Sequence, residues 1–245
     1  MHNFVEAFQF IGRNGQVPGA GHLPTLTYYA LGTIEIAAIA MAISLVIALP
    51  IGLWLGHIHR GSFIAINLGN VWRALPSLAV LAIGLAFFGL GLKNVLLALC
   101  VLAVPPIITN AYVAIDQVDA DLVDAARGMG MTGWQVLLRV ELPQAIPLMM
   151  AGVRTAALFV VSTTTLGALV GDDDSLGSIV NNETGYHLSG VLGAAICIAA
   201  LAIVQELLLA WLQRALTPLA LRRTGAAEFV DDEVALLAAE PAGLG

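Results

Sequence analysis

The chain has 245 residues, of which 59% are hydrophobic and only 11% are charged. In soluble domains about a quarter of the residues are charged, so this composition excludes an ordinary soluble protein and predicts a polytopic membrane protein. The formal net charge of −7 is carried largely by acidic clusters at Asp172–Asp174 and near the carboxyl terminus, so no nucleic-acid partner is expected.

Residues 1–25 are predicted to form an extracytoplasmic lead-in, a short interfacial segment followed by a turn, since Phe4, Phe8 and Phe10 are mixed with glycines and Pro18. This segment lacks the basic start and apolar core of a cleavable signal peptide, so the first span is expected to target the chain. Leu26 to Leu55 is apolar over more than the roughly 20 residues that cross a bilayer, which predicts that first span.

Four more apolar stretches follow, so residues 26–216 are expected to form an all-α transmembrane domain of five helices. The second stretch is expected to be a broken helix, because polar residues and Pro76 interrupt its first half. The third is expected to kink at Pro105-Pro106. In order, these stretches are Phe63 to Leu92, Val95 to Ile115, Ala145 to Val170 and Val191 to Leu212.

A polar loop of residues 116–146 separates the third and fourth spans and carries helix signals of its own. Asp121 is expected to cap a short helix, and Gly128 and Gly130 offer positions where that helix can end with a positive φ. A capping-box pattern, Thr132–Gln135, predicts a second short helix, which Pro143 is expected to stop. The alternative is an ordinary helical connection, but two capped helices over more than twenty residues are unusual for one.

This loop also contains Asp124-Ala125-Ala126, then Gly130, and Val140-Glu141-Leu142-Pro143 after nine further residues. The pattern resembles the coupling loop of ABC importer permeases, which usually reads Glu-Ala-Ala, Gly and Ile-x-Leu-Pro. Asp124 and Val140 are conservative departures from it. Further runs resemble the osmoprotectant branch, whose members import quaternary amines such as glycine betaine, choline, carnitine and proline betaine: Ala125–Met131, Arg139–Pro143 and Ala151–Ala156.

The resemblance implies a type I ABC importer permease fold that forms half of a translocation pathway. It implies three kinds of partner: a second permease subunit, identical or paralogous, two cytoplasmic ATPase subunits that hold ATP and Mg, and an extracytoplasmic substrate-binding protein. The sequence contains no phosphate-binding loop, so this chain is expected to be a transport subunit with no catalytic residue, cofactor or metal of its own. The residues implied to contact the ATPase are Asp124, Ala125, Ala126, Gly130, Val140, Leu142 and Pro143.

The basic residues of the short loops predict the orientation in the membrane, since they favour the cytoplasmic side. Arg13 and Lys93 fall on one side of the five-span arrangement, and six arginines fall on the other: Arg60, Arg127, Arg139, Arg214, Arg222 and Arg223. We therefore expect a multi-pass cell-membrane protein with its amino terminus outside and its carboxyl terminus in the cytoplasm. Residues 217–245 are expected to form a mobile acidic tail there.

Four ionisable side chains fall inside or near the apolar runs, where a charge is costly unless it is paired or hydrated. Arg154 and Glu206 are interpreted as pairing between helices or snorkelling, with a role in the transport pathway as the alternative. Glu35 fits an interhelical and a pore-facing role equally. Arg73 precedes the break at Leu75-Pro76, which favours contact with freed backbone groups over gating.

Residues 171–190 are predicted to form an exposed loop between the last two spans. Asp172, Asp173 and Asp174 stand where the resembling permeases tend to show a glycine-rich run. This cluster is interpreted either as a docking surface that attracts the binding protein or a cationic solute, or as a solvated linker.

Three other functions stay open on the sequence: an ABC importer for amino acids such as methionine, a passive channel and an intramembrane enzyme. A channel would need no ATPase. An enzyme would need paired catalytic residues in the spans, and the sequence shows none.

Overall fold

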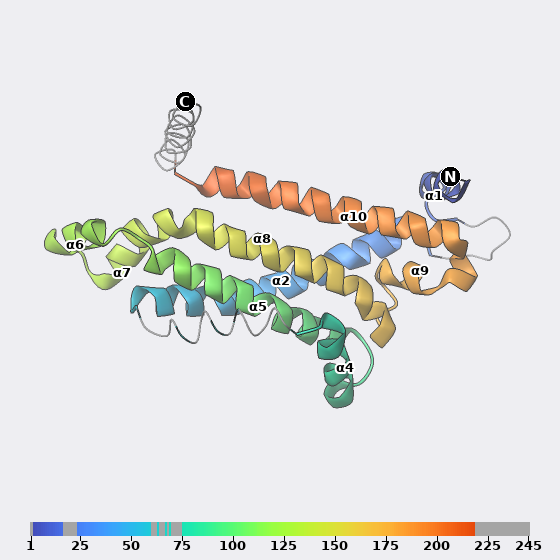
Figure 1. Cartoon of the computed structure of the whole chain (residues 1–245), viewed down its shortest axis with the longest axis horizontal. Coiled ribbons are helices and arrows are strands. Elements are labelled where there is room, and N and C mark those ends of the chain that lie inside the picture. The colour runs from blue at the N-terminus through green and yellow to red at the C-terminus, as the bar shows by residue number, and fades with distance from the viewer. Residues whose placement is uncertain are drawn as a thin grey trace, which may run out of the picture.

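The computed structural model describes residues 2–16, 24–59 and 75–218, together with Phe63, Asn67 and Gly69. Helices account for all regular structure in these segments, which contain no strand. Figure 1 shows the long helices lying side by side along the longest axis of the molecule. A short helical hairpin, α6 and α7, lies at one end of this bundle, and α1, α4 and α9 lie at the other.

Four helices of the described residues are long and apolar enough to cross a membrane, which confirms the all-α, multi-pass prediction. They correspond to the predicted first, third, fourth and fifth spans. The four are α2 (Leu26–His57), α5 (Leu92–Asp116), a long helix that includes α8 (Leu142–Gly167) and the 3₁₀ turn η2 (Ala168–Val170), and α10 (Glu183–Leu216).

The predicted second span, Phe63 to Leu92, falls partly outside the described residues, and Arg73 lies outside them. Its described second half is α4 (Ser77–Phe88), which begins directly after Pro76. This start agrees with the expected break at that proline. Gly89 then ends the helix with a φ of 73°, in the left-handed region that glycine enters without steric cost.

The core of the bundle lies where α5 packs between α2 and α8. Small residues bring these helices close together: a Cβ placed on Gly52 would lie 2.7 Å from Ala111 Cβ, and one on Gly56 would lie 2.7 Å from Ile115 Cβ. Such small-residue contacts are typical of membrane helices, which gain van der Waals packing from close approach. The α5 helix continues through Pro105 and Pro106 as one element, and the kink expected there stays a prediction.

The last helix, α10, lies along the outside of the bundle beside α8 (Figure 1). It begins at Glu183 rather than at the predicted Val191, because the Asn182 side chain caps it by accepting the Gly185 N–H at 3.0 Å. His187, with a φ of 58°, interrupts its first turns. The prediction that residues 171–190 form only a loop is therefore wrong.

The lead-in contains an 11-residue helix, α1 (His2–Gly12), which lies across the first turns of α10 (Figure 1). Ala7 and Phe10 are buried in this contact, and the Phe10 ring meets the Tyr186 ring edge-on with centroids 6.1 Å apart. Phe4 and Phe8 stay exposed. Helix α1 is thus amphipathic and fixed to the bundle along one side.

Candidate functional site

The loop that resembles a coupling loop folds into a helical hairpin, here called the α6–α7 hairpin (residues 117–141). Its first helix is α6 (Ala120–Gly128). Asp119, and not Asp121, caps this helix: the Asp119 carboxylate accepts the Asp121 N–H at 2.9 Å. The predicted cap is therefore wrong by two residues, since Asp121 already belongs to the first turn. There its negative charge is favourable beside the helix dipole.

The turn between the two helices follows the sequence signals. Gly130 has a φ of 85°, as predicted for a glycine that ends a helix, and the Met131 N–H donates to the Ala126 carbonyl at 3.2 Å. The next helix, α7 (Gly133–Val136), opens with the predicted capping box, in which the Thr132 N–H donates to Gln135 Oε1 at 2.9 Å.

Pro143 does not stop the second helix, so that prediction is wrong. Helix α7 passes through a π-helical turn, η1 (Leu137–Glu141), directly into α8, and Pro143 lies in the first turn of α8. A proline normally clashes with the carbonyl four residues earlier and leaves it unpaired. The wider π turn, in which the Leu142 N–H donates to the Leu137 carbonyl, relieves that crowding. The hairpin is therefore continuous with a membrane-spanning helix.

The residues implied to contact an ATPase occupy different parts of the hairpin. Asp124, Ala125 and Gly130 are exposed at its surface. Ala126 is buried and Val140 half-buried in a small apolar cluster that joins α6 to the second helix, with Val123 and Val136. Leu142 and Pro143 are half-buried at the base. The motif therefore supplies both the surface of the hairpin and the packing that holds its two helices together.

The base of the hairpin also contacts the end of α2 through two residues that the sequence did not single out as a pair. Glu141 Oε2 lies 2.7 Å from His57 Nδ1, and the Glu141 side chain is only 1% exposed. Beside them, the Trp54 and Trp134 rings lie with centroids 6.1 Å apart. The position of Glu141 among apolar residues was the only sign of this contact in the sequence, because its partner His57 is 84 residues away in the chain.

At the other end of the bundle the aspartate cluster is less exposed than predicted. Asp172 is 4% exposed, and burial raises the pKa of its carboxyl group. Asp174 is exposed but accepts the Tyr28 hydroxyl at 2.7 Å. The segment folds inward because the Leu176 N–H donates to Thr33 Oγ1 at 2.9 Å. Asp173 is thus the exposed carboxylate of the three with no hydrogen-bond partner among the described residues.

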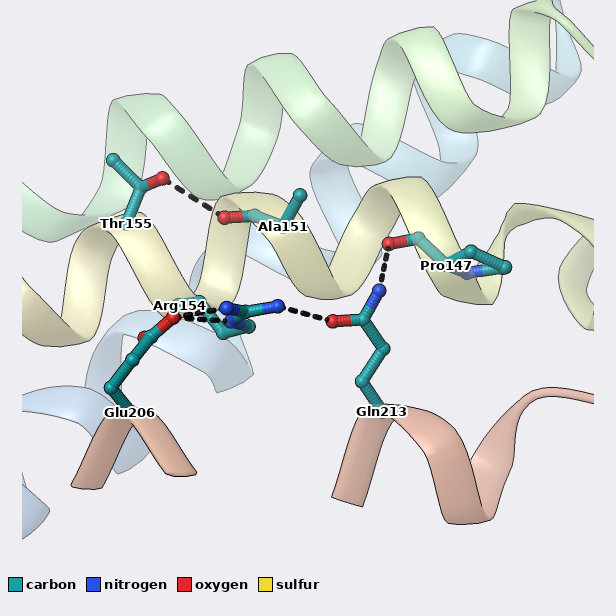
Figure 2. Close-up of polar contacts among 6 residues, drawn as sticks. All are labelled: Pro147, Ala151, Arg154, Thr155, Glu206 and Gln213. Carbon is teal, nitrogen blue, oxygen red and sulfur yellow. Dashed lines mark hydrogen bonds and ion pairs between the residues drawn. The ribbon is translucent and has the colours of Figure 1, made fainter. Parts of the chain in front are cut away.

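Arg154 and Glu206 contact each other between α8 and α10 (Figure 2). Arg154 Nε donates to Glu206 Oε1 at 2.9 Å, and Nη2 donates to the same oxygen. Arg154 Nη1 donates to Gln213 Oε1 at 2.8 Å, and Gln213 Nε2 donates to the Pro147 carbonyl at 3.1 Å. This polar chain ties the second half of α10 to α8.

Glu35 is exposed on α2 and has no hydrogen-bond partner among the described residues. In the same part of the chain, no three His, Cys, Asp or Glu side chains lie together as a metal site would require. The features that the described residues do show are capped helix ends, a helical hairpin and contacts between helices.

Comparison with known proteins identifies the family. The model of the family "binding-protein-dependent transport system inner membrane component" matches residues 48–219. The carnitine transport permease protein OpuCB of Listeria monocytogenes is 35% identical over 222 residues, which cover 91% of this chain and 97% of that protein. The choline transport system permease protein OpuBD of Bacillus subtilis is 37% identical over 195 residues, covering 78% of this chain and 84% of that protein.

Among solved structures, a chain of the MetNI methionine ABC transporter, in inward-facing conformations, has a similar fold. The TM-score is 0.68 at 22% sequence identity, over 79% of this chain and 96% of that one. At this identity the likeness concerns the fold alone. The family model and the two permeases give the assignment: the chain belongs to the family of inner-membrane components of binding-protein-dependent transport systems.

Proposed function

We propose that this chain is the permease subunit of an ATP-driven importer of osmoprotectant quaternary amines such as choline, carnitine, glycine betaine and proline betaine. The observation that carries the proposal is the 35% identity, over 91% of this chain, to a carnitine transport permease. Choline permeases of the same family are similarly related. The chain contributes half of the pathway wall, and a second permease subunit, identical or paralogous, contributes the rest.

The α6–α7 hairpin docks into a groove of a separate ATPase subunit. Asp124 and Ala125 lie on its exposed surface, where the short alanine side chain lets the helix backbone approach a partner closely. Gly130 provides the left-handed turn that presents this surface. ATP and Mg act on the ATPase, and this chain itself catalyses no reaction.

Movement of the docked hairpin reaches the membrane through continuous helix. Because α7, η1 and α8 follow one another without a break, a displacement at Trp134 tilts or shifts α8 as a rigid body. Two ATPases that close on ATP would move two hairpins, one in each permease subunit. The pathway would then open outward, where an extracytoplasmic binding protein delivers the solute.

The hairpin end of the bundle is cytoplasmic in this proposal. Arg127 and Arg139 lie in the hairpin, and Arg214 lies in the last turn of α10 at the same end of the molecule (Figure 1). Lys93 lies in the first turn of α5 at the opposite end, and Arg13 follows α1 there. This asymmetry supports an outer amino terminus and a cytoplasmic carboxyl terminus.

The proposed organisation has an extracytoplasmic lead-in (1–25), a transmembrane domain (26–216) with the coupling loop (116–146), and a cytoplasmic acidic tail (217–245). Most of the tail, residues 219–245, lies outside the described residues. Asp172, Asp173 and Asp174 belong to the outer surface in this organisation. With Asp172 buried and Asp174 bonded to Tyr28, Asp173 is the carboxylate available to a binding protein.

The experiment that tests this function uses the purified complex of this permease with its ATPase and binding protein in lipid nanodiscs. ATP hydrolysis is measured with choline, carnitine, glycine betaine, proline betaine and methionine as separate additions. Stimulation by one or more quaternary amines, and none by methionine, is expected. Stimulation by methionine alone would instead support the amino-acid alternative.

A further inference from the structure

The buried carboxylate of Glu141 is unusual in an otherwise apolar helix base. The side chain is 1% exposed, its Oε2 is hydrogen-bonded to His57 Nδ1 at 2.7 Å, and its Oε1 has no partner among the described residues. A carboxylate at such a site is costly without a partner. His57 therefore compensates much of the cost of burying Glu141, and the contact joins residues 84 positions apart in the sequence.

The second nitrogen of His57 also faces the hairpin. A Cβ placed on Gly133, the first residue of α7, would lie 3.3 Å from His57 Nε2. The imidazole therefore packs against the backbone of α7 on one side and bonds to η1 on the other. One turn earlier on α2, the Trp54 ring lies 6.1 Å from the Trp134 ring, centroid to centroid. Three contacts thus converge on one helix end.

These contacts have a mechanical consequence because α2 does not adjoin the hairpin in the chain: α4 and α5 lie between them. The hairpin is joined through the chain to α5 on one side and to α8 on the other. Helix α2 packs along α5 but lies outside this covalent path. A push on the hairpin would reach α2 directly through the contacts of His57 and Trp54, beside which Leu53 packs against the apolar cluster that contains Leu137.

We propose that His57 and Glu141 are positioning residues that fix the end of α2 to the α6–α7 hairpin, so that α2 moves with the hairpin during each transport cycle. The proposal rests on the proposed function, in which the hairpin receives the movement of an ATPase. The π turn supports it, because such turns interrupt α-helices frequently at functional sites and this one ends at Glu141. Trp54 and Trp134 add an apolar contact to the same joint.

A neighbouring contact provides a matched control. His59 Nδ1 lies 2.9 Å from Asp116 Oδ1 and so joins the same end of α2 to the end of α5, with no part of the hairpin involved. Both side chains are exposed, at 54% and 40%, where an ion pair contributes little. Replacing His59 by Ala removes a histidine from the same helix end without touching the proposed joint.

The test measures solute imported per ATP hydrolysed, in proteoliposomes that contain the complete complex and with whichever solute stimulates the wild-type ATPase. His57→Ala should lower this ratio by about fivefold or more while hydrolysis continues, the scale of a typical coupling between sites. His57→Asn should keep the ratio within about twofold, because its amide nitrogen lies where Nδ1 does. His59→Ala should leave the ratio unchanged.

His57→Ala alone leaves Glu141 without a partner and can reduce folding, so a second variant separates stability from coupling. In His57→Ala with Glu141→Met, no buried charge remains and the side-chain volume at position 141 is kept. This double variant should fold and bind the ATPase, yet import less solute per ATP hydrolysed, to the same extent as His57→Ala alone. If the double variant imported as much solute per ATP hydrolysed as the wild type, the proposal would be refuted.

The same measurements distinguish a wrong role for His57 and Glu141 from a wrong proposed function. A wild-type complex without any solute-stimulated hydrolysis would refute the proposed function and the inference together. If the wild type is coupled and both variants that carry His57→Ala import as much solute per ATP as it does, only the role of His57 and Glu141 is refuted.

Discussion

Replacement of Arg154 by Met should destabilise the packing of α10 on α8 by an amount that the structure allows us to estimate. Arg154 donates to Glu206 and to Gln213, and the variant loses all of these bonds while it keeps an apolar stem. Removing one partner of a buried ion pair costs about 3–5 kcal/mol. Both side chains belong to membrane-spanning helices, where lipid or detergent would not hydrate an unpaired Glu206 carboxylate, so we expect a loss of about 3–5 kcal/mol.

Two further variants make the estimate specific. Arg154→Met combined with Glu206→Leu leaves no unpaired charge, and apolar replacement of a whole ion pair is often neutral, so the double variant should recover about 2 kcal/mol. Gln213→Leu removes its bonds to Arg154 and to the Pro147 carbonyl, which should cost about 1–2 kcal/mol. The predicted order of stability is wild type, then the double variant and Gln213→Leu, then Arg154→Met.

Equilibrium unfolding of the purified subunit in detergent, followed by tryptophan fluorescence, measures these differences, since Trp211 lies on α10 itself. Denaturant midpoints and slopes would give the free energy of unfolding for each variant. The prediction is a double variant more stable than Arg154→Met alone. A double variant no more stable than Arg154→Met alone would refute the view that the two charges interact.

Three other predictions concern the two ends of the molecule. Ala125→Trp should leave membrane insertion intact but abolish uptake and co-purification of the ATPase, whereas Ala125→Ser should behave as wild type; normal uptake with Trp would contradict docking through this surface. A cysteine at position 173 should react with an impermeant thiol reagent from outside, and one at Thr132 should react only after the membrane is opened; the reverse pattern would overturn the orientation. Asp172→Asn should raise the melting temperature at pH 7 but have little effect near pH 4. Burial raises the pKa of this carboxyl group in the folded state, so stability is lost as the pH rises through that pKa; equal shifts at both pH values would contradict the effect of burial.

Much of the fold followed from local signals in the sequence. Apolar runs of sufficient length predicted the spans, and Thr132 with Gln135 predicted the start of α7, because capping depends on residues three positions apart. Gly130 was expected to adopt a positive φ for the same kind of local reason. The motif at Asp124 located the hairpin, although which of its residues are exposed became clear only from the packing of α6 on α7.

The features that sequence reasoning missed depend on contacts between distant segments. Pro143 was expected to end a helix, but the π turn before it removes the clash that makes proline a helix breaker. Asp172 was expected to be exposed, yet Leu176 bonds to Thr33 on α2 and draws the loop inward. His57 and Glu141 carry no local sign of their pairing across the fold. In each case the outcome was set by a neighbour that the local sequence does not reveal.

The most direct test of the proposed function is uptake of a radiolabelled quaternary amine by proteoliposomes that contain the complete complex. The binding protein and labelled choline or carnitine are supplied outside, and ATP is enclosed within. The account predicts accumulation against a concentration gradient that requires enclosed ATP and disappears in the Ala125→Trp variant. Equal uptake without ATP, or no uptake of any quaternary amine by a complex that accumulates methionine, would contradict it.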